Sequence, residues 1–259
     1  MNQPLSYIDP QAKIAQNVVI EPFTVIEKDV EIGEGSWIGP HVTIHSGAKI
    51  GKNCKIFPGA VIAGLPQDLK FEGERTTAEI GDNTVVRECV TISRGTKDKY
   101  TTSIGQNCLL MAYVHIAHDC TIGNNCIMVN AVQLAGHVTI EDHAIVGGAS
   151  AVHQFVNIGA HVFVAGGSLV RKDVPPFTKA GRDPLSYVGI NSIGLRRRGF
   201  SNEKIREIQE VYRYVYLKGL NNATACDLIE LEMPPSRERD EILNFIRNSE
   251  RGVMRGTNQ

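Results

Sequence analysis

A hydrophobic residue recurs at every sixth position through the first two thirds of the chain. Every sixth residue from Ile8 to Ile62 is isoleucine, and the spacing resumes over 80–92 and runs unbroken from Ile104 to Val170. The interruptions fall at Asp68, Glu74 and Asp98. A period of six cannot keep one face of an α-helix, which repeats every 3.6 residues. The pattern instead predicts a parallel β-helix, an all-β solenoid in which each group of six forms one side of a coil.

A second position, four residues after each of these, holds small or branched side chains. Its members include Ser36, Val42, Ala48, Cys54, Thr84, Cys108, Cys120, Cys126, Val138, Ala144 and Ser150. We interpret the four cysteines among them as packing residues rather than ligands or nucleophiles. Three groups of six close a coil of 18 residues, so residues 18 apart should stack at the ~4.8 Å spacing of neighbouring strands.

The breaks in the period predict loops that leave the coil near 63–79 and 93–103, and such loops are common places for function. The period ends after Val170, and a cluster of Gly, Pro and Asp around 181–184 marks a boundary. We therefore predict a β-helix domain over 1–182 and a small α-helical domain over 183–259. Ser201 is the predicted N-cap of a helix that stops at Gly219, and further helices are predicted near 222–232 and from Ser236.

Composition narrows the class of protein. The 259 residues carry a formal net charge of −1, which argues against a general nucleic-acid binder. The first residues do not read as a secretory leader, and no apolar run reaches the ~18 residues needed to span a bilayer. Six cysteines without a leader favour reduced thiols over a disulfide framework. We expect a cytoplasmic protein with no integral membrane segment.

None of the eight histidines occupies either inward position, so all should point away from the core. The coil phase places four of them along one corner, close to the stacked residues Ile116, Leu134 and Val152. These four are His115, His118, His137 and His153. His143 and His161, also one coil apart, should stack at a different corner.

A histidine-rich corner allows three interpretations. It could be exposed polar surface, or a metal site, although the spacing does not demand three converging ring nitrogens. It could also supply a general base, because histidine is the side chain whose unperturbed pKa lies nearest neutrality. Asp119 could orient His118, but adjacent residues on a strand face opposite ways, so this pairing requires a turn.

Several motifs make a more specific match. The segments HIAHDCTIGN, LAGHVTI, GGASAVHQF, DLKFEGE and GLRRRGFS resemble those of the acyl-carrier-protein-dependent UDP-N-acetylglucosamine O-acyltransferases, hexapeptide-repeat enzymes that begin lipid A synthesis in Gram-negative bacteria. The resemblance implies a left-handed coil and a homotrimer with active sites between subunits. It also implies transfer of a 3-hydroxyacyl chain from acyl carrier protein to the 3-hydroxyl of UDP-N-acetylglucosamine, without metal or cofactor.

The same resemblance implies residue roles. His118 would be the general base, Asp119 its orienting partner, and the backbone N–H of Gly136 the oxyanion donor. Gly166 would end the acyl groove and so set chain length. Substrate contacts would come from Asp68, Lys70, His115, His137, His153, Gln154, Asn191, Arg197 and Arg198. Ser93 stands where the family commonly has histidine, which puts one substrate contact in doubt.

Rival functions remain. The later N-acyltransferase of the same pathway carries an extra domain before its β-helix, for which a period starting at Ile8 leaves no room. A coenzyme A-dependent hexapeptide acetyltransferase usually has a shorter β-helix without this helical tail. A zinc-dependent β-helix hydratase would hold stoichiometric zinc, and a non-catalytic scaffold would not depend on His118.

Overall fold

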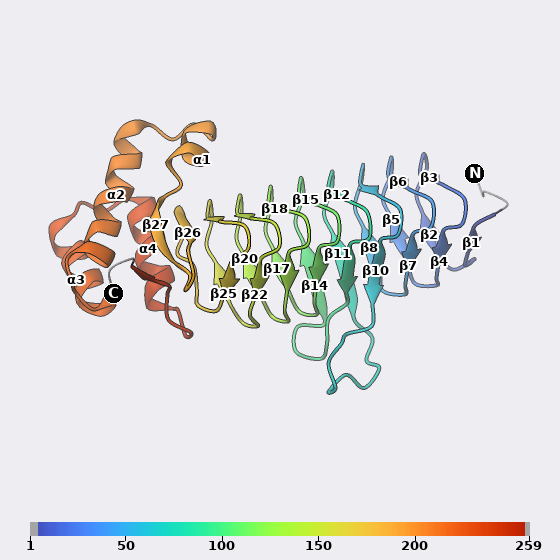
Figure 1. Ribbon diagram of the computed structural model, residues 1–259. Coiled ribbons are helices and arrows are strands. Elements are labelled where there is room, and N and C mark those ends of the chain that lie inside the picture. Colours follow the sequence, from blue (N-terminus) through green and yellow to red (C-terminus); the bar gives the residue numbers. More distant parts are fainter. Residues whose placement is uncertain (1–4, 257–259) are drawn as a thin grey trace.

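The computed structural model describes residues 5–256, which form a three-sided rod of parallel strands with helices at its carboxyl end (Figure 1). Each strand pairs with strands one coil away, which produces three long sheets, here called A, B and C. Sheet A contains β1 (Tyr7–Ile8), β4 (Val25–Ile26), β7 (Thr43–Ile44), β10 (Val61–Gly64), β13 (Thr91–Ser93), β16 (His115–Ile116), β19 (Gln133–Leu134), β22 (Ala151–Val152) and β25 (Leu169–Val170).

Sheets B and C form the other two sides of the rod. Sheet B contains β2 (Lys13–Ile14), β5 (Glu31–Ile32), β8 (Ala48–Ile50), β11 (Thr77–Ile80), β14 (Thr101–Ile104), β17 (Thr121–Ile122), β20 (Thr139–Ile140) and β23 (Asn157–Ile158). Sheet C contains β3 (Val19–Ile20), β6 (Trp37–Ile38), β9 (Lys55–Ile56), β12 (Val85–Val86), β15 (Leu109–Leu110), β18 (Ile127–Met128), β21 (Ile145–Val146), β24 (Phe163–Val164), β26 (Thr178–Gly181), β27 (Ser186–Ile190) and β28 (Arg255–Gly256).

The predicted stacking of hydrophobic residues forms the core. Ile116 pairs with Leu134, and Leu134 with Val152, so residues 18 apart lie side by side on sheet A. These side chains are at most 2% exposed. The core therefore consists of continuous columns of branched side chains, in which each residue packs on the residues of the coils above and below.

The four cysteines at the small inward position are buried, with at most 2% of each residue exposed. Each thiol contacts a backbone carbonyl of a neighbouring turn, as Cys120 contacts Ala135 at 3.2 Å. Burial raises the pKa of Cys120 to about 12, so this thiol stays protonated and unreactive at neutral pH. The burial and contacts of these cysteines agree with a packing role rather than with a reactive or metal-binding one.

Two loops project from the same side of the rod (Figure 1). The first spans 65–76 between β10 and β11, and the second spans 94–100 between β13 and β14. Both are shorter than predicted, because β11 continues its parallel pairing with β14 from Thr77↔Thr101 through Ile80↔Ile104. Since both loops connect sheet A to sheet B, they rise from one corner of the rod on successive coils.

The carboxyl-terminal part begins with β26 and β27, which form an antiparallel pair. The predicted domain boundary at 182/183 falls in the turn between them and stays a prediction. Four helices follow: α1 (Ser192–Arg197), α2 (Asn202–Leu217), α3 (Asn222–Glu232) and α4 (Arg237–Arg247). Ser201 is the N-cap of α2 as predicted, and the helix predicted from Ser236 is α4, with Ser236 as its N-cap. Gly219 just after α2 has φ +70°, the left-handed value of a helix stop.

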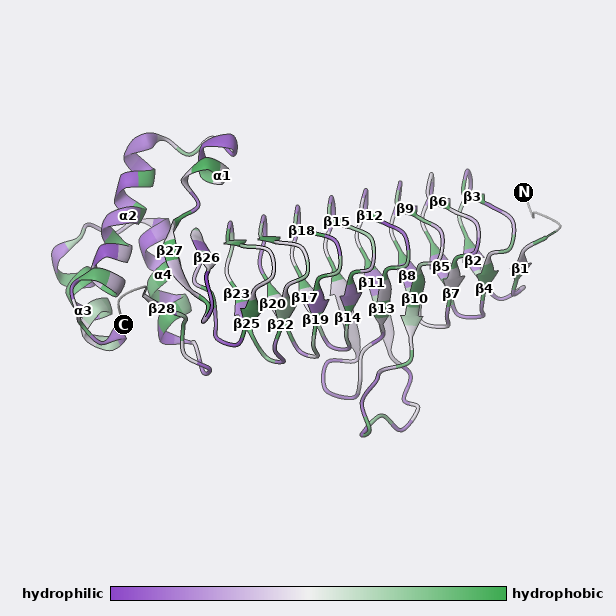
Figure 2. Ribbon diagram, in the orientation of Figure 1, coloured by the Kyte–Doolittle hydropathy of each residue, from purple (hydrophilic) through white to green (hydrophobic). Residues whose placement is uncertain are grey.

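The helices pack on one another through a second hydrophobic cluster that includes Leu195, Ile208, Tyr212 and Ile242. In Figure 2 they carry both hydrophobic and hydrophilic colours, as amphipathic helices do. Within residues 5–256 none of the helices has the length and apolar character required to cross a membrane.

The outer surfaces of the three sheets differ in chemistry. Sheet B presents ion pairs between neighbouring strands, Lys13–Glu31 and Lys49–Glu79, each at 2.8 Å. Sheet C presents a nearly continuous apolar row, made of Val19, Trp37, Val85, Leu109, Ile127, Ile145 and Phe163. Sheet A is mixed, with apolar residues such as Val25 and Leu169, which are 37% and 49% exposed.

Candidate active site

Most of the predicted site residues gather at the corner where sheet A meets sheet B, here called the A–B corner. His115 lies on β16, His118 and Asp119 lie in the turn between β16 and β17, and His137 lies in the equivalent turn one coil later. Both projecting loops leave the same corner. The coil phase therefore correctly placed residues that are far apart in sequence on one edge of the rod.

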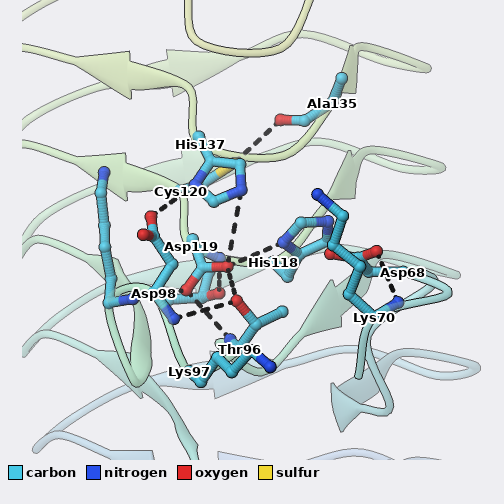
Figure 3. A network of polar contacts seen from close by, with 12 residues as sticks. Asp68, Lys70, Thr96, Lys97, Asp98, His118, Asp119, Cys120, Ala135 and His137 are labelled. Carbon is cyan, nitrogen blue, oxygen red and sulfur yellow. Dashed lines mark hydrogen bonds and ion pairs between the residues drawn. The ribbon is translucent and has the colours of Figure 1, made fainter. Parts of the chain in front are cut away.

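A turn resolves the question of how two adjacent residues can pair. Asp119 has a φ of 60°, the left-handed conformation, which swings its side chain back toward its neighbour. His118 Nδ1 then lies 2.8 Å from Asp119 Oδ2 (Figure 3). Because the carboxylate accepts the Nδ1 proton, Nε2 is the nitrogen left to accept a proton from another molecule.

Asp119 is fully buried and holds the second loop as well as the histidine. Its carboxylate accepts hydrogen bonds from Thr96 N at 3.0 Å, Thr96 Oγ1 at 2.7 Å and Lys99 N at 3.2 Å. Burial alone would raise the pKa of Asp119, but the hydrogen bonds from Thr96 and His118 outweigh it and hold the pKa below its usual value. The group is therefore a carboxylate at neutral pH.

Gly136 packs closely against the His118 ring. A Cβ at this position would lie 2.6 Å from His118 Cε1 and 2.8 Å from Nε2, so only glycine leaves room for the ring. The Gly136 amide donates none of the hydrogen bonds found in residues 5–256. The residue packed against the His118 ring thus carries an unused backbone donor.

The other three histidines of the corner have different surroundings. His137 sets its ring edge-on to His118, with centroids 5.1 Å apart, and stacks on Phe155 at 4.5 Å. His115 Nδ1 is 2.7 Å from Thr91 Oγ1, and burial together with the nearby His118 lowers the pKa of His115.

His153 is more exposed than the other three, and its Nδ1 is 3.2 Å from Arg251 Nη2. Its neighbour Gln154 is also exposed. Among the contacts of residues 5–256, none joins His153 to another histidine of the corner. His153 and Gln154 therefore border the corner rather than form its centre.

Asp68 and Lys70 stand on the first loop, where Asp68 Oδ1 accepts a hydrogen bond from Lys70 N at 3.0 Å. In the view of Figure 3 they lie on the His118 side of the network, while Asp98 lies on the other. The two loops thus flank the histidine pair.

The remaining predicted residues lie at other corners. Arg198 Nη2 donates to the carbonyl of His143 at 2.9 Å, and Asn191 Nδ2 donates to the carbonyl of His161 at 2.9 Å. Both contacts are with the B–C corner, between sheets B and C, and Arg197 is exposed at the adjoining end of α1. His143 and His161 stack there with centroids 4.8 Å apart, as predicted.

Gly166 lies at the third corner, between β24 of sheet C and β25 of sheet A, here called the C–A corner. It is exposed, and a Cβ there would come 3.2 Å from the carbonyl oxygen of Gly148, one coil earlier. A single chain therefore gathers most of the predicted site at the A–B corner but keeps Asn191, Arg197 and Arg198 at the B–C corner and Gly166 at the C–A corner.

His118, Asp119 and His137 have the donor types of a three-ligand metal site, with ligand atoms within 4.8 Å of one another. However, the Asp119 carboxylate already accepts hydrogen bonds from His118, from both donors of Thr96 and from Lys99. A metal would have to displace several of these partners. We therefore assign the cluster to hydrogen bonding.

The sequence did not point to Thr96, Lys99 or Asp98 as parts of the site. They lie in a loop without periodicity, so no coil phase could place them. The one available signal was the interruption of the period itself. Ser93, the departure from the family pattern, ends β13 just before this loop and is 5% exposed.

Two family models match the sequence. The one described as "Udp N-acetylglucosamine O-acyltransferase; Domain 2" matches residues 173–254, and the one described as "Bacterial transferase hexapeptide (six repeats)" matches 11–44, 29–64 and 101–136. The acyl-[acyl-carrier-protein]–UDP-N-acetylglucosamine O-acyltransferase of Sulfurihydrogenibium sp. is 58% identical over 251 residues, covering 96% of this chain and 93% of that protein. The enzyme of the same name from Chlorobaculum parvum is 55% identical over 250 residues, covering 96% and 95%.

Solved structures agree with these matches. A UDP-N-acetylglucosamine acyltransferase from Bacteroides fragilis superposes with a TM-score of 0.96 at 50% identity, covering 98% of this chain and 100% of that one. The corresponding enzyme of Francisella novicida gives a TM-score of 0.96 at 42% identity, covering 100% and 95%. The predicted left-handed β-helix of hexapeptide repeats, followed by a helical region, is confirmed.

Replacing Asp119 by alanine should release the second loop, because three hydrogen bonds from Thr96 and Lys99 lose their acceptor. We expect trypsin to cleave after Lys97 or Lys99 at least about ten times faster than in the unmodified protein. Limited proteolysis with mass spectrometry of the fragments measures this. Asp142→Ala is the matched control, since Asp142 accepts a hydrogen bond from Asn124 N in a turn away from both loops. Equal cleavage rates in all three proteins would contradict the anchoring role.

Proposed function

The chain belongs to the family of acyl-[acyl-carrier-protein]–UDP-N-acetylglucosamine O-acyltransferases, and we propose that His118 is the general base of its reaction. The enzyme transfers an acyl chain from acyl carrier protein to UDP-N-acetylglucosamine, the first step of lipid A synthesis. We take the chain to be a 3-hydroxyacyl group and the acceptor to be the 3-hydroxyl of the sugar. The observation that carries the proposal is the buried contact between His118 and Asp119, with Gly136 beside the same ring.

An alcohol attacks a thioester poorly unless its proton leaves as the new bond forms. His118 Nε2 is suited to take that proton, because Asp119 fixes the Nδ1 proton and stabilises the imidazolium. The sugar oxygen then bonds to the thioester carbon and gives a tetrahedral oxyanion. When the carbon–sulfur bond breaks, the leaving thiolate takes the proton from His118, and the histidine returns to its starting state.

The tetrahedral oxyanion needs a hydrogen-bond donor at the place where its charge develops. The Gly136 amide meets this need, because it has no hydrogen-bond partner in the described chain and lies next to the base. Losing such a donor typically costs about 10²–10³ in rate. Base and donor thus come from successive coils, 18 residues apart, and are held at a fixed spacing by the parallel strands.

Replacing His118 by alanine tests the proposal directly. We expect kcat to fall by about 10²–10⁴, the usual contribution of a general base, with the protein still folded. The assay incubates purified protein with UDP-N-acetylglucosamine and a panel of 3-hydroxyacyl carrier proteins and measures product by mass spectrometry. His45→Ala is a matched control, because His45 also contacts a carboxylate, Glu27 at 2.9 Å, but several coils away. Full activity of His118→Ala would remove His118 as the base.

We further propose that the active enzyme is a homotrimer. An apolar row such as that on sheet C is rarely left in water and favours an interface. A three-fold axis requires two different faces of each protomer to meet, and sheet A is the other partly apolar face. Sheet B, with its ion pairs, would then face solvent. This arrangement places the C–A corner nearest the axis.

In this trimer, sheet A of one protomer packs against sheet C of the next. Two corners that lie outside this contact are thereby brought close together. The A–B corner of the first protomer then faces the B–C corner of its neighbour across a groove. His118 and the loop residues Asp68 and Lys70 would line one wall of this groove. The neighbour's Asn191, Arg197 and Arg198 would line the other. The trimer would thereby gather residues that one chain keeps apart.

Arg198 is suited to the nucleotide end of this groove. Its Nη1 is buried without a hydrogen-bond partner in the described chain, and so is Nδ1 of the nearby His161. Burial and the charges of His143 and Arg198 lower the pKa of His161 to about 4, so this histidine is neutral near pH 7. A guanidinium with an unused N–H suits a diphosphate, whose oxygens accept hydrogen bonds in matching geometry.

Subunit mixing distinguishes a shared site from one within a single chain. His118→Ala and Arg198→Ala should each lower kcat/KM strongly, but coexpressed in equal amounts they should regain about a quarter of the wild-type activity. A site is complete when one protomer supplies His118 and the next supplies Arg198. Each of these two positions has an even chance of holding the required protomer, so about a quarter of the sites are complete. Activity of the purified mixed trimers measures the effect. No recovery from stable mixed trimers would contradict the shared site.

Gly166 is proposed to set the length of the acyl chain. An acyl chain that enters between sheets A and C would run inward toward the C–A corner, where Gly148 and Gly166 leave two successive turns without side chains. We expect Gly166→Met to shift the preference toward shorter chains, because its side chain would fill the end of the groove. Competition between acyl carrier proteins of different chain length measures this, and unchanged selectivity would count against the assignment.

The rival functions fit less well. High identity to O-acyltransferases extends over 96% of the chain, including its carboxyl-terminal helices, which separates it from shorter coenzyme A-dependent acetyltransferases. The zinc hydratase is disfavoured because the carboxylate among the possible ligands is already engaged in hydrogen bonds. A protein that served only as a scaffold would have no use for a buried His118–Asp119 contact packed against Gly136.

A further inference from the structure

His137 lies between two carboxylates. Its Nδ1 is 3.1 Å from Asp98 Oδ2, and its Nε2 is 3.9 Å from Asp119 Oδ2 (Figure 3). The side chain of His137 is 13% exposed and that of Asp98 is 63% exposed, so the pair spans from the site to its rim. Neither contact has the geometry of a hydrogen bond, and Nδ1 is buried without a hydrogen-bond partner in residues 5–256, so the two carboxylates confine the ring by their position.

The ring of His137 instead meets the base. It stands edge-on to His118 at an interplanar angle of 89° and is backed by the stacked ring of Phe155. A ring held in this way limits how far His118 can turn about its bond to the main chain. Asp98 is the partner on the outer nitrogen, and its position decides whether the His137 ring keeps this orientation.

Asp98 is itself fixed by the network that holds Asp119. Its backbone N donates to Thr96 Oγ1 at 3.3 Å, and the same hydroxyl donates to Asp119 Oδ2 at 2.7 Å. The second loop therefore reaches the catalytic pair by two routes. One runs through Thr96 to Asp119, and the other runs through Asp98 to His137.

We propose that Asp98 is a positioning residue, which orients His137 and through it the base His118. Asp119 would thus hold the base directly, and Asp98 would hold it from a second side through another imidazole. The inference rests on the proposed function of His118. An ion pair with so exposed a carboxylate adds little to stability, so its effect should be on rate rather than on folding.

The experiment compares Asp98→Ala, Asp98→Asn and the control Lys97→Ala in the full-length enzyme. Lys97 belongs to the same loop, but its ammonium faces Glu72 at 3.7 Å instead of His137. We expect Asp98→Ala to lower kcat by about 3- to 10-fold, with KM for UDP-N-acetylglucosamine and the thermal midpoint nearly unchanged. Asp98→Asn keeps the size of the side chain and removes its charge, so it should show most of the same loss. Lys97→Ala should match wild type.

Two further measurements separate positioning from a general effect of the loop. In a His137→Asn background, Asp98→Ala should cause no additional loss of kcat, because the residue through which it acts is gone. A crystal structure of Asp98→Ala should show the His137 ring turned from its place beside His118. Wild-type kcat in Asp98→Ala, or an equal loss in both backgrounds, would overturn the proposal. Failure of the proposed base is distinguished by His118→Ala retaining activity, whatever the Asp98 variants do.

Discussion

The structure depends on one constraint, which is that each coil must hydrogen-bond to the next in parallel register. Gly33 N to Ile50 O and His115 N to Val132 O are two bonds of this ladder. Because the ladder fixes every residue beside its equivalent one coil away, a side chain at a turn is stacked over the same turn of its neighbours. The corner that holds His118, Gly136 and His137 follows from this regularity and needs no special local fold.

The proposed catalytic residues lie where a loop interrupts the repeating coils. The second loop leaves the ladder after Ser93 and returns at Thr101, and two of its backbone N–H groups, those of Thr96 and Lys99, donate to the carboxylate of Asp119. The buried carboxylate of Asp119 therefore has two roles, because it anchors the second loop and also orients the His118 ring. This explains why a carboxylate can be fully buried at a site that must also exchange protons with substrate.

The sequence could predict those features whose position is fixed by the regular hydrogen-bonding between coils. The columns of Ile116, Leu134 and Val152, the buried cysteines and the His143–His161 stack all follow from counting in steps of 18. Asp98 could not be placed in this way, because the loop that carries it has no equivalent in the next coil. The helix caps were predictable from local chemistry, whereas the meeting of Arg198 with the B–C corner depends on how the helices fold back, which no local signal encodes.

Coil geometry also limits how such a chain can change its length. Removing a whole coil leaves every later corner in line, whereas removing a single group of six rotates everything downstream by about a third of a turn. A deletion of that kind between the loops and His137 would carry the histidine to a different edge while leaving the hydrophobic columns intact. Such a variant keeps its hydrophobic columns but loses the alignment of its corners, which only the removal of a full winding preserves.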